Sequence, residues 1–218
     1  IELLLRVLNI SFPIFYQLNP YTGFSLRPGL AARYQAEGGN NIKISSAGLR
    51  DREHSKIKPE NTFRIAVLGD SQAEAMGVPL ENAFWFVMEK KLNQCENFRG
   101  KQVEAINFGF SDFGTAQELL VLRHYAWDYS PDLVLLAIST STDIRNNSRI
   151  LDGSPVRPYF YYEGNDLKFD DSFLQSSEYK ARTTWAAKVL YDFLTYSRTL
   201  QVLREARTRL MDDQVTQR

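Results

Sequence analysis

A short polar loop follows the first strand-length apolar run of the sequence. Phe63 to Leu68 is nearly all apolar, and Gly69, Asp70 and Ser71 come directly after it; we call residues 69–72 the first loop. Glycine permits a tight exit from a strand, and Asp70 can accept backbone N–H bonds. Ser71 begins the next segment, where neighbouring amides can hold an oxyanion. Ser71 is therefore a candidate nucleophile; the alternative is that Asp70 and Ser71 only cap a helix.

Two more polar loops follow the next two apolar runs. The second loop, residues 107–114, reads Asn-Phe-Gly-Phe-Ser-Asp-Phe-Gly and follows Val103 to Asn107. The third loop, residues 139–143, reads Ser-Thr-Ser-Thr-Asp and follows Leu133 to Ile138. Loops that leave the carboxyl ends of parallel strands converge at one edge of the sheet, where ligands bind. The sequence therefore predicts an active-site edge built from the three loops.

Four sequence blocks contain these loops: RIAVLGDS, MGVPLENAFW, VEAINFGFSDFGTAQELL and YSPDLVLLAISTSTDIRNNSR. In this order they resemble the SGNH hydrolases, also called the GDSL esterase and lipase family, and the resemblance runs from about Ser45 to Phe169. The resemblance implies a three-layer α/β/α sandwich with a parallel sheet of flavodoxin-like order, 2-1-3-4-5. It also implies a serine esterase in which Ser71 is the nucleophile and donates its own backbone amide to the oxyanion.

Two positions depart from the pattern of that family. Its second block usually reads Asn-x-Gly-x-Ser-Gly, and Asp112 stands where the last glycine donates an amide. Its third block usually reads Gly-x-Asn-Asp or Gly-Asn-Asp, and Ser141, Thr142 and Asp143 stand there. Loss of one oxyanion donor typically lowers the rate about 10²- to 10³-fold. The resemblance implies oxyanion donors at Ser71, Asp112 and Thr142, and structural residues of the site at Gly69, Asp70 and Asp143.

The general base is the missing part of the pattern. A serine hydroxyl becomes a good nucleophile when a histidine accepts its proton. The family carries this histidine in an Asp-x-x-His motif near the C-terminus, and the 218 residues contain no such motif. Of the two histidines present, we expect His124 on a helix surface and His54 in a surface loop. The alternative for His54 is a substitute base, because its loop directly precedes the strand that leads to Ser71. We therefore expect the base to lie downstream of Arg218, and the 218-residue piece alone to be inactive.

Apolar runs of strand length alternate with stretches of helical periodicity in the middle of the chain. The three runs Phe63–Leu68, Val103–Asn107 and Leu133–Ile138 are apolar on both faces, and helices are expected over Ala83–Leu92 and Thr115–Tyr129. Such strands indicate a parallel sheet covered by helices on both sides. The predicted fold class is α/β. Because such sheets usually have about five or six strands, we expect further strands downstream.

The two ends of the chain have a different character from this middle part. Loop signals dominate Leu18–Glu60, and we interpret residues 1–60 as an N-terminal extension of an incomplete α/β domain at 61–218. After the third strand we expect a hairpin, Tyr159–Tyr162 with Leu167–Phe169, and one long helix from about Thr184 to Leu210. The aromatic side chains of the hairpin either form a platform for sugar or acyl groups or pack on the sheet edge.

Composition excludes several classes of protein. With 26 Lys and Arg against 26 Asp and Glu, the net charge is zero, which gives no electrostatic reason to expect a nucleic-acid partner. The single cysteine, Cys95, excludes an intramolecular disulfide and zinc sites built on several thiolates. No metal or organic cofactor is expected. Charged residues interrupt the apolar stretch Ile1–Tyr16, which falls short of the ~18 apolar residues of a membrane span.

These observations lead to two expectations for function. The first is an enzyme that hydrolyses an oxygen ester of a lipid or an acylated carbohydrate through an acyl-enzyme on Ser71. The second is a binding or scaffold module on the same fold, in which the altered second and third blocks have removed acyl transfer. Family resemblance slightly favours an exported or membrane-anchored protein, with any membrane association in a segment that precedes Ile1.

Overall fold

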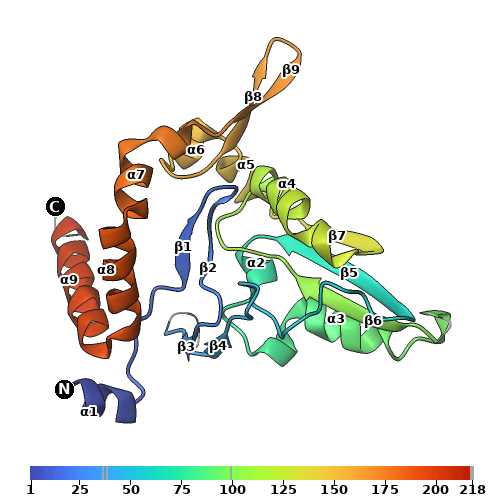
Figure 1. The fold of residues 1–218 in the computed structure, drawn as a ribbon, viewed down its shortest axis with the longest axis horizontal. Helices are drawn as coiled ribbons and strands as arrows, with labels where there is room; N and C mark the ends of the chain where they lie inside the picture. Colours follow the sequence, from blue (N-terminus) through green and yellow to red (C-terminus); the bar gives the residue numbers. More distant parts are fainter. Residues whose placement is uncertain (36, 38, 99, 217–218) are drawn as a thin grey trace.

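The computed structural model describes residues 1–35, 37, 39–98 and 100–216. Its centre is a three-stranded parallel sheet in the order β6-β5-β7 (Figure 1). β5 (Thr62–Gly69) pairs with β6 (Gln102–Asn107) along one edge and with β7 (Leu133–Ala137) along the other. All three strands lie where the sequence predicted them, and the α/β class is confirmed.

Alternate residues of β5 face two separate apolar clusters, as the two-residue period of a strand requires. Ile65 and Val67 pack with Trp85 and other residues of α3 (Phe84–Leu92) on one face. On the opposite face, Ala66 and Leu68 share a cluster with residues of α4 (Thr115–His124) and of the segment after it. The sheet is therefore covered on both sides, as expected.

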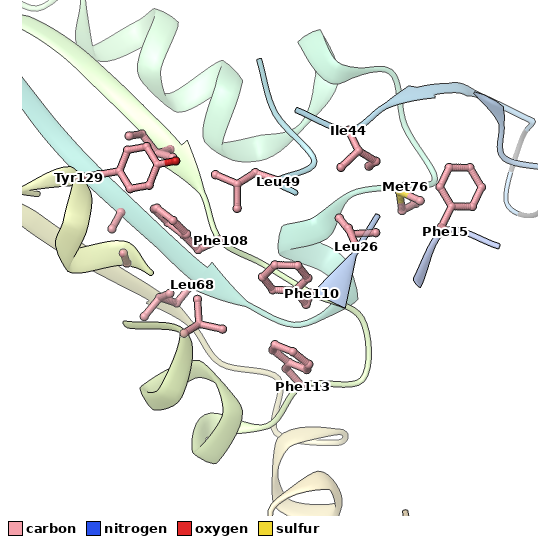
Figure 2. Close-up of a cluster of buried hydrophobic side chains, with 14 of the residues drawn as sticks. Phe15, Leu26, Ile44, Leu49, Leu68, Met76, Phe108, Phe110, Phe113 and Tyr129 are labelled. Carbon is pink, nitrogen blue, oxygen red and sulfur yellow. The ribbon is translucent and has the colours of Figure 1, made fainter. Parts of the chain in front are cut away.

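The N-terminal segment forms two hairpins that the sequence did not predict. They pair β1 (Tyr16–Asn19) with β2 (Gly23–Leu26), and β3 (Ala31–Arg33) with β4 (Asn41–Lys43). Their apolar side chains join the cluster on the α4 side of the sheet, where Figure 2 shows Leu26 close to Phe110. Residues 1–60 thus share a core with the α/β part. The N-terminal contributors to this core are Phe15, Leu26, Leu30, Ile42, Ile44 and Leu49.

The expected helix from Thr184 to Leu210 is wrong in one respect, because the chain breaks it at Ser197. The structure has α8 (Trp185–Tyr196) and α9 (Arg198–Thr216), with an extended backbone at Ser197 (φ −88°, ψ 112°). Glu2 stabilises the break from the other end of the chain by accepting hydrogen bonds from the amides of Arg198 and Thr199 at 3.1 and 2.9 Å. Unpaired amides at a helix start need such acceptors. α8 and α9 lie side by side (Figure 1).

The expected helix Thr115–Tyr129 is also divided. α4 ends at His124, and after Tyr125 the chain forms a short 3₁₀ turn, η3 (Ala126–Tyr129). The expected hairpin is confirmed as β8 (Tyr159–Glu163) and β9 (Asp166–Asp170), which project from the rest of the molecule in Figure 1. The remaining elements are α1 (Glu2–Val7), α2 (Ser71–Glu74), η1 (Leu80–Asn82), η2 (Glu96–Phe98), α5 (Asp143–Asn146), α6 (Arg149–Asp152), η4 (Ser172–Gln175) and α7 (Ser177–Thr183).

β7 is much less covered than the other two strands of the sheet. β5 is its partner along one edge, and no strand pairs with its other edge in the described part of the chain. Leu133 is 47% exposed, Leu136 is 41% exposed and the following Ile138 is 61% exposed, although parallel strands normally bury such residues on both faces. None of the helices in the described ranges is both long and apolar enough to cross a membrane.

Candidate active site

The three polar loops meet at the carboxyl end of the parallel sheet, as the sequence predicted. The amide of Phe110 in the second loop donates to the carbonyl of Gly69 in the first loop at 3.0 Å. The hydroxyl of Thr142 in the third loop donates to Asp70 Oδ2 at 2.8 Å. The first loop is therefore bonded directly to both of the others.

Two glycines allow α2 to sit directly on the ends of the strands. Ala73 in the middle of α2 is fully buried. A Cβ atom on Gly69 would lie 2.8 Å from Ala73 Cβ, and one on Gly109 would lie 2.5 Å from it, which is closer than real Cβ atoms approach. Any side chain at either position would push α2 outward. The exposed side chain of Ser71, at the start of α2, is thus fixed at the sheet edge.

Asp70 occupies most of the amides around Ser71. Its Oδ1 accepts from the amide of Gln72 at 3.0 Å, and its carbonyl accepts from the amides of Ala73 and Glu74 at 3.1 and 2.9 Å. Among the described residues, the amide of Ser71 has no acceptor and its hydroxyl has no hydrogen-bond partner. A nucleophile and one hydrogen-bond donor are therefore available to a ligand at the same residue.

Asp112 in the second loop has a left-handed backbone conformation, with φ of 60°. This conformation favours glycine and is tolerated by aspartate and asparagine. The residue is exposed, and its amide has no acceptor within the described ranges. A second unoccupied donor is thus present in a loop bonded to the one that contains Ser71.

The third loop is fixed by its own hydrogen bonds. Asp143, 2% exposed, accepts from the amide of Ser139 at 2.9 Å. The hydroxyl of Thr142 lies 2.6 Å from Ser139 Oγ as well as 2.8 Å from Asp70 Oδ2. Because a carboxylate can only accept, the single hydroxyl hydrogen of Thr142 is directed to Asp70. In this structure Thr142 therefore acts on the cap of α2.

A buried carboxyl group lies behind the loops on α4. Glu118 is 1% exposed, and neither of its carboxyl oxygens has a hydrogen-bond partner among the described residues. Burial, together with the nearby negative charges of Asp143 and Asp70, raises the pKa of Glu118 to about 8. Glu118 is therefore neutral at pH 7. Burial and the charge of Asp70 also raise the pKa of Asp143.

Neither histidine has a contact with Ser71 in the described ranges. His54 lies in a surface loop, as expected, but its side chain points inward: it is 2% exposed, with Nε2 3.1 Å from Asp51 Oδ2 and Nδ1 2.6 Å from Glu104 Oε1. Burial opposes its charge, but the two carboxylates raise its pKa to about 9. A histidine that already holds a proton at pH 7 is no general base. His124 is exposed, as expected, and stacks on Tyr21 with ring centroids 4.1 Å apart.

A cavity of about 720 Å³ opens beside the second loop at Ser111 and Asp112. The β1–β2 hairpin forms one wall, and α7 and α8 form the other. Sequence reasoning missed this cavity, because one wall comes from the segment interpreted as an extension, and the other comes from α8, interpreted as part of one long helix, and from α7, for which no element was predicted. Its apolar and aromatic lining residues include Ile14, Tyr16, Leu18, Phe24, Val156, Tyr179 and Tyr191.

Glu74 is the other residue of the site that sequence reasoning missed. It ends α2, is fully buried, and accepts hydrogen bonds from the hydroxyls of Tyr16 and Ser111. Acidic residues are almost never fully buried unless they are paired, so nothing in its sequence neighbourhood predicts this position. The one available signal is its spacing of one helical turn from Ser71.

Comparison with protein-family models, with curated proteins and with solved structures found no match for the chain. The described residues contain no group of three or more His, Cys, Asp or Glu side chains that could hold a metal ion.

Proposed function

We propose that the protein is a serine ester hydrolase of the SGNH type. The observation that carries the proposal is the set of unoccupied groups on two bonded loops: the hydroxyl and amide of Ser71 and the amide of Asp112 have no partner among the described residues. An ester carbonyl needs a nucleophile on its carbon and two or more donors on its oxygen. These three groups are of the required kinds.

In the proposed reaction, Ser71 Oγ attacks the ester carbonyl, its proton passes to a base, and the alcohol leaves to give an acyl-enzyme that water hydrolyses. The amides of Ser71 and Asp112 hold the oxyanion. The positive φ of Asp112 supports this role, since it keeps the backbone conformation of a glycine at the matching position of the family. Thr142 becomes a third donor only if its hydroxyl exchanges Asp70 for the substrate.

The base and its orienting acid are proposed to come from outside the 218 residues. His54 is paired with two carboxylates and His124 is stacked on Tyr21, so neither is placed to take the proton of Ser71. The exposed apolar residues of β7 support the proposal that further strands pack beside it. The order β6-β5-β7 corresponds to the strands 2-1-3 of the order 2-1-3-4-5. The five-strand order is part of this proposal.

The cavity beside Asp112 supports an ester with a sizeable apolar group. Its volume of about 720 Å³ lies within the range of pockets that bind small molecules. Apolar and aromatic residues make up half of its lining, and an acyl chain or another apolar part of the substrate would lose contact with water against them. The other half is polar or charged and includes Arg27, Arg182 and Lys188. Lipid esters and acylated carbohydrates both contain such a group.

A binding or scaffold module is the second candidate. Two observations favour it: the hydroxyl of Thr142 is engaged by Asp70, and the carboxylate of Asp112 would repel a developing oxyanion. In that case the same cavity would bind an apolar ligand without cleaving it.

Covalent labelling of the full-length protein separates the two functions. A fluorophosphonate probe should modify Ser71, identified by peptide mass spectrometry, and a short-chain aryl ester should be hydrolysed. Ser71→Ala should abolish both reactions, while Ser177→Ala, an exposed serine of α7 outside the cavity lining, should leave both unchanged. Full-length protein that neither reacts with the probe nor hydrolyses esters would support the binding module.

A further inference from the structure

Glu74 is a fully buried acid one helical turn after the proposed nucleophile. It is the last residue of α2, and Ser71 is the first. Burying a carboxyl group is costly unless it forms hydrogen bonds, so its partners indicate what the position does. Its buried neighbours in sequence, Ala73, Ala75 and Met76, are apolar, and the buried Arg50 is a nearby opposite charge.

Two hydroxyl groups from distant segments donate to the same oxygen of Glu74. The hydroxyl of Tyr16, in β1, lies 2.7 Å from Glu74 Oε2, and the hydroxyl of Ser111, in the second loop, also donates to this oxygen. Glu74 therefore joins three segments: α2, the second loop and the N-terminal hairpin. Tyr16 and Ser111 also line the cavity, so this junction forms part of its wall.

The backbone hydrogen bonds that hold the second loop to the first end one residue before Ser111. The amide of Phe108 donates to Val67 at 2.7 Å, and that of Phe110 donates to Gly69 at 3.0 Å. At residues 111 and 112, the one side-chain hydrogen bond among the described residues is that from the Ser111 hydroxyl to Glu74. The peptide unit between Ser111 and Asp112 contains the proposed oxyanion donor, so Glu74 restrains the residue on which the direction of that N–H depends.

We propose that Glu74 is a positioning residue that holds the Asp112 amide in place relative to Ser71. The inference rests on the proposed function, because the amide matters only if an oxyanion forms. The carboxyl group touches neither the reacting hydroxyl nor the substrate. It acts through its hydrogen bond with Ser111. The hydroxyl of Tyr16 holds the carboxyl group from β1, so the hairpin wall of the cavity is bonded to Glu74 too.

Kinetics of the full-length protein test this role. Glu74→Ala and Ser111→Ala should lower kcat for a short-chain aryl ester about 10- to 100-fold and leave KM within about threefold, as expected for loss of transition-state stabilisation alone. Glu74→Gln keeps an acceptor oxygen for both hydroxyls, and its kcat should stay within about threefold of the wild-type value. Tyr125→Phe is the matched control, since it removes a hydroxyl bonded to Asn19 of the same hairpin but not to Glu74.

Amide hydrogen exchange of residues 108–113 gives a readout that needs no activity. Exchange there should become faster in Glu74→Ala and Ser111→Ala and should stay as in the wild type in Glu74→Gln and Tyr125→Phe. Unchanged exchange and kcat in both truncation variants would overturn the proposal, and so would equal losses in Glu74→Gln and Glu74→Ala. If Glu74→Ala does not fold, Ser111→Ala and Tyr16→Phe test the same contacts. If the wild type hydrolyses no ester while amide hydrogen exchange changes as expected, the proposed function is wrong, but Glu74 still holds the second loop through Ser111.

Discussion

Thr142 and Asp70 belong to different loops, and the hydroxyl of Thr142 donates to Asp70 Oδ2 across a distance of 2.8 Å. The other oxygen of the same carboxyl group accepts from the amide of Gln72 at 3.0 Å and thereby caps α2. One carboxyl group thus fixes the start of α2 and connects it to the third loop. The carbonyl oxygen of Asp70 accepts from the amides of Ala73 and Glu74 as well. The amides that follow Ser71 in α2 are therefore already hydrogen-bonded.

Replacement of Thr142 by valine should measure the contribution of this contact to stability. Hydrogen bonds to charged groups contribute about 1.5–3 kcal/mol, so Thr142→Val should lower the free energy of unfolding in urea by about 1–2 kcal/mol. Ser141→Ala is the control: Ser141 is exposed, with its hydroxyl 3.3 Å from Ser139 Oγ, and should change stability by less than about 0.5 kcal/mol. Equal unfolding curves for Thr142→Val and the wild type would contradict a structural role for the bond.

Asp112 offers a test of the altered oxyanion position. Its φ of 60° suits glycine, so Asp112→Gly should be more stable than Asp112→Ala by about 1 kcal/mol, measured in urea. Removing the carboxylate also removes repulsion of the oxyanion, so Asp112→Gly in the full-length protein should hydrolyse aryl esters about 3- to 10-fold faster than the wild type.

Asp112→Asn separates charge from backbone conformation. Asparagine tolerates the left-handed region as aspartate does, so a gain in rate with Asn equal to that with Gly would assign the effect to charge. A rate that falls in both variants would instead show that the carboxylate assists the reaction.

The sheet and the position of the loops could be predicted from sequence because their signals are local. The apolar run of β7 is continuous, those of β5 and β6 are interrupted only by Arg64 and Glu104, and a short polar loop follows each run. Gly69 and Asp70 act within a few residues of Ser71, so the turn they form is visible in the sequence itself.

The features that the sequence did not reveal depend on contacts between distant residues. The burial of His54 requires Glu104, which is 50 positions away. The break at Ser197 depends on Glu2, which is 197 positions from its partner Thr199, while apolar residues continue at helical spacing on both sides of the break. All four residues of β1 are half-buried, so this strand does not alternate between a buried and an exposed face. Such an alternation is the pattern by which a strand is recognised in a sequence. For His54 and for the helix break, a local pattern was present and a distant residue changed its outcome.

The cavity beside the second loop predicts a preference for esters with a long acyl chain. Leu18, in β1, lines the cavity, and Leu18→Trp should fill part of it. Because each buried CH₂ contributes about 0.8 kcal/mol, losing two or three of them should lower the ratio of kcat/KM for octanoyl over acetyl aryl esters at least about 10-fold. Leu167→Trp is the control, since Leu167 is exposed in β9 and lies outside the cavity lining. If Leu18→Trp left the preference for acyl-chain length unchanged, the acyl chain would not bind in this cavity.

His54 should make the stability of the fold depend on pH. Burial opposes its charge, but Asp51 and Glu104 raise its pKa to about 9, above the ordinary value of 6.5. A group with a raised pKa in the folded state stabilises fully below its unfolded pKa, and this stabilisation is lost as the pH rises through the folded pKa. The contribution should therefore be complete at pH 6 and lost between about pH 6.5 and 9, with a size of about 2–3 kcal/mol.

Urea unfolding at pH 6.0, 7.5 and 9.5 checks this expectation. The stability difference between the wild type and His54→Gln should shrink as the pH rises, because glutamine cannot carry the charge. Glu74 and Glu118, with pKa values raised to about 7 and 8 mainly by burial, also lower stability over part of this range, but they do so in both proteins and cancel in the difference. His124→Gln, at the exposed histidine, should keep the wild-type pH dependence. A difference between the wild type and His54→Gln that stays constant from pH 6.0 to 9.5 would show that His54 is not held protonated by its two carboxylates.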